Sequence, residues 1–392
     1  MGFLRLCLAL AVVVAHSEPL FGWDVTRLTG GRLAVQMFYI ISGFYITLVL
    51  HRRYTGPGHY GHFMRNRFLR LYPAYATVAL LTLVIMGALS EWTPGSIWPF
   101  EYWSEWGTTL SPSSLVAVVA ANLFIFGQDA LMFLAVDPGL GGLYFTADFT
   151  AETIPAYKFL LVPQAWTLGV ELLFYVVAPL LVTRKTGTLV VVFALGLALR
   201  AFVIHGLGLH SDPWDYRFFP IELPLFLWGA IAYKAYAHLE AHGLLHREAG
   251  TAALILVLGG TLLHTQLPGR LQGGFLGLPF MCFALGLALP FLFHRTRSSA
   301  RDRWIGDLSY PIYVVHLMIV MLLGTLGWTA QLGLSACAIS ILLAILLRVY
   351  IEAPIDRWRH ADLNTDAVAS EGVLEEARLA CGPFEFSSTK CD

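Results

Sequence analysis

Apolar stretches long enough to cross a lipid bilayer recur along almost the whole chain, and they restrict it to folds that exist inside a membrane. The sequence has 392 residues, of which 57% are hydrophobic and 13% are charged, whereas soluble proteins have about 25% charged residues. A spanning helix needs about 20 mainly apolar residues. Segments of nearly that length are 3–17, 33–50, 73–90, 163–183, 187–206, 219–237, 250–265, 273–294, 308–327 and 331–351. The expected fold class is therefore an all-α polytopic membrane protein, a bundle of about ten transmembrane helices.

Basic residues decide the expected orientation, because loops rich in Lys and Arg stay on the cytoplasmic side. The loop 51–72 has five arginines and the segment 295–303 has four. Both are cytoplasmic only if the apolar run 113–127 does not cross, but lies on the membrane or re-enters it. We therefore expect both termini inside, a domain over residues 1–359 with an external loop at 91–162, and a polar, disordered cytoplasmic tail at 360–392.

The first predicted span carries two ionisable side chains, Arg5 and His16, both costly in hydrocarbon. Eleven residues at about 100° each bring the two side chains to within roughly 20° on one helix face, about 16 Å apart. Imidazole titrates near neutral pH, so His16 could act as a general base on a hydroxyl group. It could equally be an interfacial histidine in contact with water. The segment also has features of a secretory signal peptide, but its single arginine and the many later spans favour a retained helix.

Other ionisable residues inside predicted spans are functional candidates, because their burial must be compensated. Glu171 lies among leucine and valine residues, so it must meet a cation, a donor or water inside the bundle. His316 is in the same situation. Arg200 lies close enough to the end of a span to extend towards the interface. Glu222 is expected at the outer interface, with Arg217 as its partner.

Arg67 and Arg70 precede the third predicted span and lie three residues apart, on one face of a helix. Two guanidinium groups in this arrangement suit a polyphosphate anion, but arginines that only anchor a cytoplasmic loop have the same pattern. Pro73 is expected to begin the span, since proline is tolerated in the first turn. In the second span, Ser42 and Gly43 are small and favour close helix packing. The motif G-x-S-x-G, typical of a serine nucleophile, is absent.

Cysteine spacing and net charge argue against two other classes of protein. The five cysteines have no metal-ligand or redox spacing, so the sequence predicts neither a metal site nor a disulfide framework. The net charge of −1 gives no indication of a nucleic-acid partner. The lipid bilayer is the partner that the composition requires.

Several short motifs, taken together and in order, indicate a family. They are Arg5 and His16 in the first span, "FYIISGFYI", "RFLRLYP", "WTLGVELLFYVVAP", "LPLFLWGA", "GDLSYPIYVVH" and "IEAPIDR". This ordered set, over residues 3–358, resembles the integral-membrane acyltransferase family 3, which includes bacterial O-acyltransferases of polysaccharides, nodulation factors and macrolides. Thr167 stands where the family often has Ser, Ala34 where Gly is common, and Pro311 where a smaller residue is usual. None of these departures removes a titratable group.

The resemblance implies a ten-helix bundle that transfers an acyl group, usually acetyl, from cytoplasmic acyl-CoA to a hydroxyl group. It implies no permanently bound cofactor, since acyl-CoA is a substrate. The acceptor would be a carbohydrate or another cell-envelope or exported molecule. The enzyme would lie in the bacterial inner membrane, and a homo-oligomer is compatible with such a chain.

The resemblance also assigns roles to individual residues. His16 would deprotonate the acceptor or would itself be acylated, and Glu171 and His316 would orient or support the site. The arginines that would hold and place the donor are Arg5, Arg67 and Arg70. By helix rise the donor phosphates and His16 would lie more than about 10 Å apart, a gap that an extended pantetheine arm could bridge.

A proton-coupled transporter or exporter of a polar or lipid-linked molecule is the alternative function. Buried histidine and glutamate residues can form a proton relay in such proteins. Inverted repeats or paired broken helices would support a transporter, and the sequence shows neither. A non-catalytic scaffold is a third reading, for which so many polar groups inside spans would serve no purpose.

Overall fold

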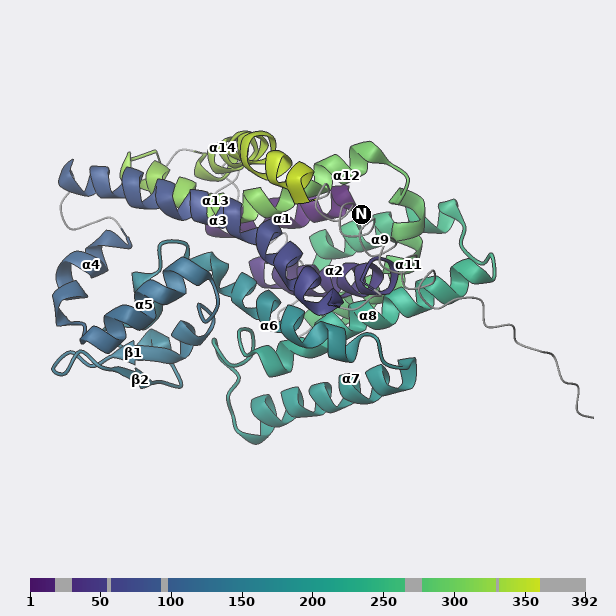
Figure 1. Cartoon of the computed structure of the whole chain (residues 1–392), viewed down its shortest axis with the longest axis horizontal. Helices are drawn as coiled ribbons and strands as arrows, with labels where there is room; N and C mark the ends of the chain where they lie inside the picture. Colours follow the sequence, from purple (N-terminus) through teal and green to yellow (C-terminus); the bar gives the residue numbers. More distant parts are fainter. Residues whose placement is uncertain (18–29, 55–57, 93–97, 265–276, 329–330, 360–392) are drawn as a thin grey trace, which may run out of the picture.

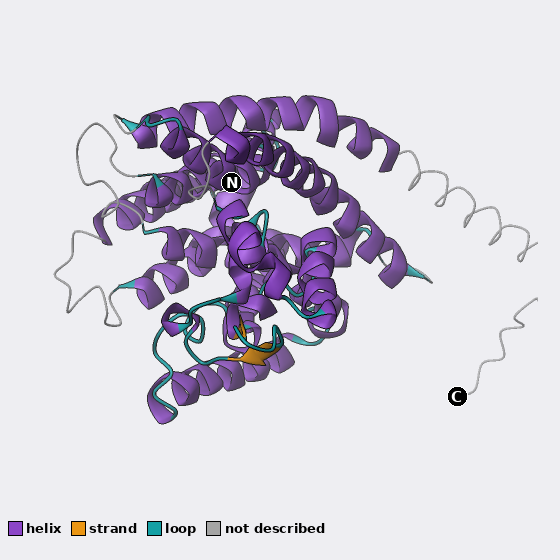
Figure 2. Cartoon of the chain, turned by 90° about the vertical axis from the view of Figure 1, so that its left-hand side faces the viewer, coloured by secondary structure: helices purple, strands orange, loops and turns teal. Residues whose placement is uncertain are grey.

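The computed structural model describes residues 1–17, 30–54, 58–92, 98–264, 277–328 and 331–359. In these ranges the chain forms a bundle of long apolar helices, with a smaller group of short helices and one β-hairpin beside it (Figure 1, Figure 2). The helices of the bundle are α1 (Gly2–His16), α2 (Gly31–Arg52), α3 (His59–Trp92), α6 (Trp166–Leu181), α7 (Thr186–Ala201), α8 (Phe219–Ala241), α9 (Arg247–His264), α11 (Leu278–Thr296), α12 (Ala300–Asp307), α13 (Ser309–Thr325) and α14 (Leu332–Leu347). The π-helical turns η7 (Phe202–Gly206) and η8 (Arg348–Glu352) extend α7 and α14. The tail predicted at 360–392 lies outside the described residues.

Seven helices among the described residues are long and apolar enough to cross a membrane. They are Gly31–Arg52, His59–Ser90, Pro163–Leu181, Thr186–Gly206, Leu278–Thr296, Ala300–Thr325 and Leu332–Arg359. The three other predicted spans are helices as well, but α1 has only 15 residues, and a spanning helix needs about 20. Charged residues lower the hydropathy of the other two: α8 includes Glu222, Lys234 and Glu240, and α9 begins with Arg247 and Glu248. The polytopic helical class is supported, whereas the count of ten spans is not established.

The third predicted span begins earlier than the sequence suggested. α3 runs without interruption from His59 to Trp92, so Pro73 lies inside the helix and not at its start. A proline inside a helix removes a backbone donor and bends the helix, and Figure 1 shows α3 bending along its length. The basic segment 51–72 is therefore mostly helical, and it carries Arg67 and Arg70 on α3 itself.

Two glycines allow α2 and α8 to approach closely. A Cβ atom at Gly43 would lie 1.9 Å from the backbone oxygen of Phe226, and a Cβ atom at Gly229 would lie 1.9 Å from the backbone oxygen of Ile40. Neither helix could keep its position with a larger residue at these points, because the obstacle is the partner's backbone. The close packing predicted from the small residues of the second span is confirmed at Gly43.

Between α3 and α6 the chain forms a compact group of short elements beside the bundle (Figure 1). The group contains α4 (Phe100–Trp106), α5 (Pro112–Phe124) and the antiparallel strands β1 (Leu134–Val136) and β2 (Leu143–Phe145). Short 3₁₀ turns complete it: η2 (Gly107–Thr109), η3 (Ala130–Phe133), η4 (Phe149–Ala151), η5 (Ala156–Phe159) and η6 (Pro163–Ala165). Its own buried core consists of Leu110, Val118, Val136, Ile154 and Phe159. The hairpin was not expected in an all-α chain, because alternation cannot be recognised over three residues.

The apolar run 113–127 is mainly helix α5, which has 13 residues. A helix of this length rises about 20 Å, which is less than the roughly 30 Å of the hydrocarbon core. α5 is therefore too short to cross a bilayer, in keeping with the prediction that the run lies on the membrane or re-enters it. Val116, Leu123 and Phe124 on this helix are more than half exposed, which gives α5 the apolar surface that such a position requires.

Candidate active site

α1 packs among α2, α12, α13 and α14, and its first turn rests on α12. The backbone N–H groups of Gly2 and Phe3 donate to the carboxylate of Asp302 at 2.7 and 3.0 Å. A Cβ atom at Gly2 would lie 1.6 Å from the backbone oxygen of Asp302, so only glycine fits there. The helix is continuous to His16, which keeps Arg5 and His16 on one element, about 16 Å apart along its axis.

The two histidines predicted for the site lie side by side. The ring centroids of His16 and His316 are 5.1 Å apart, with 55° between the ring planes. His16 Nδ1 lies 2.9 Å from the backbone oxygen of Val12, and His316 Nδ1 lies 2.5 Å from that of Tyr313. A carbonyl oxygen can only accept a hydrogen bond, so each Nδ1 carries the proton, and each neutral ring presents an unprotonated Nε2. Both imidazoles can therefore accept a hydrogen bond at Nε2.

His316 is completely buried, and its Nε2 has no hydrogen-bond partner among the described residues. Three hydrogen bonds hold the surrounding helices together. Thr167 Oγ1 donates to the hydroxyl of Tyr313 at 2.8 Å, the Tyr313 hydroxyl donates to the backbone oxygen of Gln164 at 3.0 Å, and Gln164 Nε2 donates to that of Val314 at 2.5 Å. Gln164 and Tyr313 were not predicted from the sequence. Tyr313 lies three residues before His316 on one helix face, and this spacing was the available indication.

Glu171, predicted to act with the histidines, makes its hydrogen bonds elsewhere in the described structure. Its Oε1 accepts from Ser42 Oγ at 2.5 Å and from the hydroxyl of Tyr175 at 2.6 Å. Tyr175 lies within electrostatic range of Arg67 and Arg70, so Glu171 belongs to the end of the bundle that holds the arginines. Ser42, for which packing was the expected role, is a donor to this half-buried carboxylate.

The three arginines predicted to hold the donor lie on α1 and α3. Arg5 forms no hydrogen bond or ion pair with another described residue, and the charges within its electrostatic range include Arg70 and Asp307. Arg67 lies over the ring of Phe63, 5.7 Å from its centroid, and its Nε is buried without a partner in the described part of the chain. Arg70 forms an ion pair with Asp307, with 3.7 Å between Nη2 and Oδ1. The fold thus brings all three arginines to one end of the bundle.

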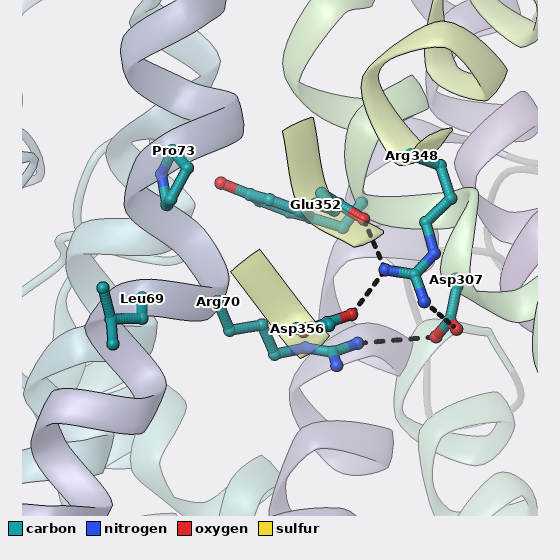
Figure 3. Close-up of a pocket in the computed structure, with 8 residues that line it drawn as sticks. Leu69, Arg70, Pro73, Asp307, Arg348, Glu352 and Asp356 are labelled. Carbon is teal, nitrogen blue, oxygen red and sulfur yellow. Dashed lines mark hydrogen bonds and ion pairs between the residues drawn. The ribbon is translucent and has the colours of Figure 1, made fainter. Parts of the chain in front are cut away.

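Arg70 also belongs to a cluster of charged side chains that was not predicted from the sequence (Figure 3). Asp307 pairs with both Arg70 and Arg348, at 3.7 and 3.1 Å. Arg348 in turn pairs with Asp356 at 2.5 Å and with Glu352 at 3.5 Å. These side chains line a cavity of about 10 Å³, which has room for about one water molecule. Glu352 and Asp356 come from the motif "IEAPIDR", so the motif itself was the indication that these acids matter.

A second group of charges lies on α7, α8 and α2. Glu222 is completely buried and pairs with Arg200 at 2.7 Å. Both of its carboxylate oxygens also accept from Gln36 Nε2, at 3.1 and 3.0 Å. Arg217, predicted to be the partner of Glu222, pairs with Asp212 at 2.6 Å. That prediction was wrong, because the carboxylate of Glu222 faces α7 and meets the guanidinium of Arg200 there.

Asp129 is a buried carboxyl group outside the apolar helices, and its pKa is raised. Asp129 lies between α5 and η3 and is 9% exposed, and its burial raises the pKa of the carboxyl group from 3.8 to about 6. A Cβ atom at Gly169 would lie 2.6 Å from Asp129 Oδ1. Asp129 therefore contacts α6 at Gly169, two residues beyond Thr167, and joins the group of short elements to the bundle.

Comparison with known proteins gives one extensive match. Residues 1–351 match a family profile described as an acyltransferase domain, and this range includes every predicted site residue. The chain is similar to "Nodulation protein 10" of Rhizobium leguminosarum bv. viciae, with 24% identity over 381 residues that cover 91% of this chain and 92% of the relative. It is also similar to "Protein 2 in picA locus" of Rhizobium radiobacter, with 37% identity over 81 residues, 20% of this chain and 39% of that protein. No solved structure matches the chain.

Proposed function

The chain belongs to the acyltransferase family whose profile covers residues 1–351, and from this premise we propose that it transfers an acyl group from acyl-CoA to a hydroxyl group. The family match and the apolar helices support a multi-pass membrane acyltransferase. We further propose that the donor is acyl-CoA, with acetyl as the simplest acyl group, and that the acceptor is a carbohydrate of the cell envelope. We also propose that the enzyme lies in the bacterial inner membrane with both termini in the cytoplasm.

The observation that carries the proposal is the pair of His16 and His316, whose ring centroids lie 5.1 Å apart and whose Nδ1 atoms both face backbone carbonyl groups. His16 Nδ1 donates to a backbone carbonyl at 2.9 Å, which leaves Nε2 as the base. In the proposed reaction Nε2 takes the proton of the acceptor hydroxyl, and the oxygen attacks the thioester carbonyl carbon. The carbon–sulfur bond then breaks, and the departing CoA thiolate takes the proton back from Nε2. The products are an ester and free CoA, and His16 returns to its neutral state.

His316 would hold the acceptor or relay its proton. Its Nε2 is buried and unpaired in the described structure, and leaving such an acceptor without a partner costs about 1–3 kcal/mol. A substrate hydroxyl that donates to this atom removes that cost, so the site favours a hydroxyl-bearing ligand. A second possibility keeps His16 as the group that is itself acylated, with His316 accepting the proton of the attacking hydroxyl.

The arginines at the other end of α1 would bind the donor. Arg67 and Arg70 both lie near Tyr175 and Glu171, and guanidinium groups bind phosphate oxygens through paired hydrogen bonds. Arg5 forms no ion pair with a described residue, so its charge is available to an anionic ligand. About 16 Å of helix separates Arg5 from His16, and the extended pantetheine arm of the donor would have to cover much of that distance.

Release of CoA by the purified protein in nanodiscs tests the proposal directly. Acetyl-CoA is supplied with candidate acceptors, and we expect release by wild type, none by His16→Ala, and unchanged release by the matched control His205→Ala on η7. Arg67→Ala/Arg70→Ala should raise the KM for acetyl-CoA, whereas Arg184→Ala should not. If wild type neither binds acetyl-CoA nor releases CoA with any acceptor, the donor assignment is wrong.

A single-turnover experiment separates the two roles of His16. Wild type is mixed with radiolabelled acetyl-CoA in the absence of acceptor and is then precipitated. Stoichiometric label on wild type that is lost in His16→Ala indicates an acyl-histidine, and absence of label in a preparation that is active with acceptor indicates direct attack.

A further inference from the structure

The guanidinium group of Arg70 already has a partner in this structure, the carboxylate of Asp307 (Figure 3). The 3.7 Å between Arg70 Nη2 and Asp307 Oδ1 is an ion pair, but it is too long for a hydrogen bond. Asp307 Oδ2 accepts a hydrogen bond from Arg348 Nη2 at 3.1 Å. The same carboxylate is therefore shared between two arginines, loosely with Arg70 and more closely with Arg348.

The charges around this contact balance. Three arginines and three acids form its ion pairs, namely Arg70, Arg348, Arg359, Asp307, Glu352 and Asp356. The charges within this cluster cancel, so it adds little to the attraction that Arg5 and Arg67 exert on a polyphosphate. For an anion to bind Arg70 with full strength, the nearest acid must turn away from it.

Among these contacts, Arg70–Asp307 is the one that can open most easily. Arg348 holds Asp356 at 2.5 Å, so it keeps a close partner whatever Asp307 does. Asp307 keeps its ion pair with Arg348 when Arg70 turns away, so the carboxylate is not left without a cation. Arg70 gains the bound phosphate as its new partner. The hydroxyl of Tyr310 on α13 donates to the backbone oxygen of Leu71 on α3, which fixes the two helices against each other. Opening the pair therefore needs side-chain rotation alone.

We propose that Asp307 is a positioning residue that holds Arg70 in the donor-free enzyme and yields it to the phosphate groups of the incoming CoA ester. A phosphate replaces one long ion pair with short, charge-assisted hydrogen bonds, while Arg348 retains Asp307. The inference rests on the proposed use of acyl-CoA. The ion pair keeps Arg70 neutralised until the donor binds, whereas Arg5 and the Nε of Arg67 have no partner among the described residues.

The test is the affinity of the protein for CoA in nanodiscs, measured by titration calorimetry. Asp307→Asn removes the competing charge, and CoA should bind about fivefold more tightly, the equivalent of one weak ion pair. Asp307→Glu lengthens the carboxylate so that it can close the 3.7 Å gap to Arg70, and CoA should bind more weakly. Glu240→Gln is the matched control, since Glu240 pairs with Arg52 and Arg297 in a separate cluster.

A double-mutant comparison assigns the effect to Arg70. In an Arg70→Ala background, Asp307→Asn should leave CoA affinity unchanged, because the arginine it competes for is gone. If wild type binds CoA but Asp307→Asn binds it equally or more weakly, the positioning role is refuted while the acyl-CoA donor stands. If wild type does not bind CoA at all, both the donor assignment and this inference are refuted.

Discussion

Replacing Arg200 by methionine should destabilise the protein far more than replacing Arg217 by methionine. Glu222 is 0% exposed, and Arg200 is the cation that lies 2.7 Å from its carboxylate. Removing that cation leaves a buried carboxylate, and among the described residues only Gln36 still donates a hydrogen bond to it. Breaking a buried pair from one side costs about 3–5 kcal/mol, because the remaining charge stays uncompensated.

Arg217 provides the matched comparison, because the sequence had assigned Glu222 to it. Its actual partner, Asp212, has a side chain that is 36% exposed and can regain water when the pair is broken. Arg217 itself is 16% exposed, bonds Asp212 through two nitrogens and lies 4.3 Å above the ring of Trp166. Arg217→Met should therefore cost somewhat more than an exposed pair, about 1–2 kcal/mol. The expected difference between the two variants is at least about 1 kcal/mol, because only Arg200→Met leaves a fully buried charge without its cation.

A double variant shows whether the cost comes from the stranded charge. Glu222→Gln neutralises the acid and leaves Arg200 bonded to the backbone oxygens of Ile221 and Asp215. Adding Glu222→Gln to Arg200→Met should therefore recover most of the lost stability. The assay is the unfolding temperature in detergent, followed by intrinsic tryptophan fluorescence. Equal melting of Arg200→Met and Arg217→Met, or no recovery in the double variant, would refute the reasoning.

Two further variants test the packing of α2 against α8 and the group of short elements between α3 and α6. Gly43→Ala should prevent stable assembly, since the added Cβ would lie 1.9 Å from the backbone oxygen of Phe226; Gly259→Ala, with nothing within 4 Å of the added atom, is the control and should melt at or above the wild-type temperature. Asp129→Asn should change the pH dependence of stability. Folding raises the pKa of Asp129 from 3.8 to about 6, so the folded state binds more protons between these values and stability falls as pH rises from about 4 to about 6, by about 3 kcal/mol. The check is the melting temperature measured at several pH values between about 4 and about 6. If it falls no more steeply with pH in wild type than in Asp129→Asn, the carboxyl group is not stabilised in its neutral form.

The spacing of residues within one helix was enough to predict several features of the site. Helical periodicity predicts that Arg5 and His16 share one helix face, and α1 is continuous between them. Gly43 was assigned to close packing from its size, and the structure shows the partner backbone that requires it. Local geometry of this kind depends on the helix alone, so it can be read before the tertiary structure is known.

The choice of partner for each buried charge could not be predicted in the same way. Arg70, Asp307 and Arg348 lie on three different helices, and their pairing depends on how α3, α12 and the end of α14 are placed together. Glu222 was assigned to the nearest arginine in the sequence, whereas its partner Arg200 lies on the preceding helix and faces it across the α7–α8 contact. The start of α3 was predicted wrongly at Pro73 for a related reason. A proline inside a helix and a proline at its start look the same in a sequence.

Helix α12 connects the two ends of the proposed site mechanically. Asp302, near its start, accepts hydrogen bonds from the first backbone N–H groups of α1, and Asp307, at its end, pairs with Arg70 on α3. A Cβ atom at Gly306 would lie 2.6 Å from Cα of Gly2, so the backbones of α12 and α1 are in direct contact. The contact with α12 therefore fixes the position of α1 along its own axis at the arginine end of the bundle. The same helix α12 carries Asp307, the ion-pair partner of Arg70. α12 also continues into α13, since Ala300–Thr325 is one helix, so the helices that carry His16 and His316 are both anchored at this end of the bundle.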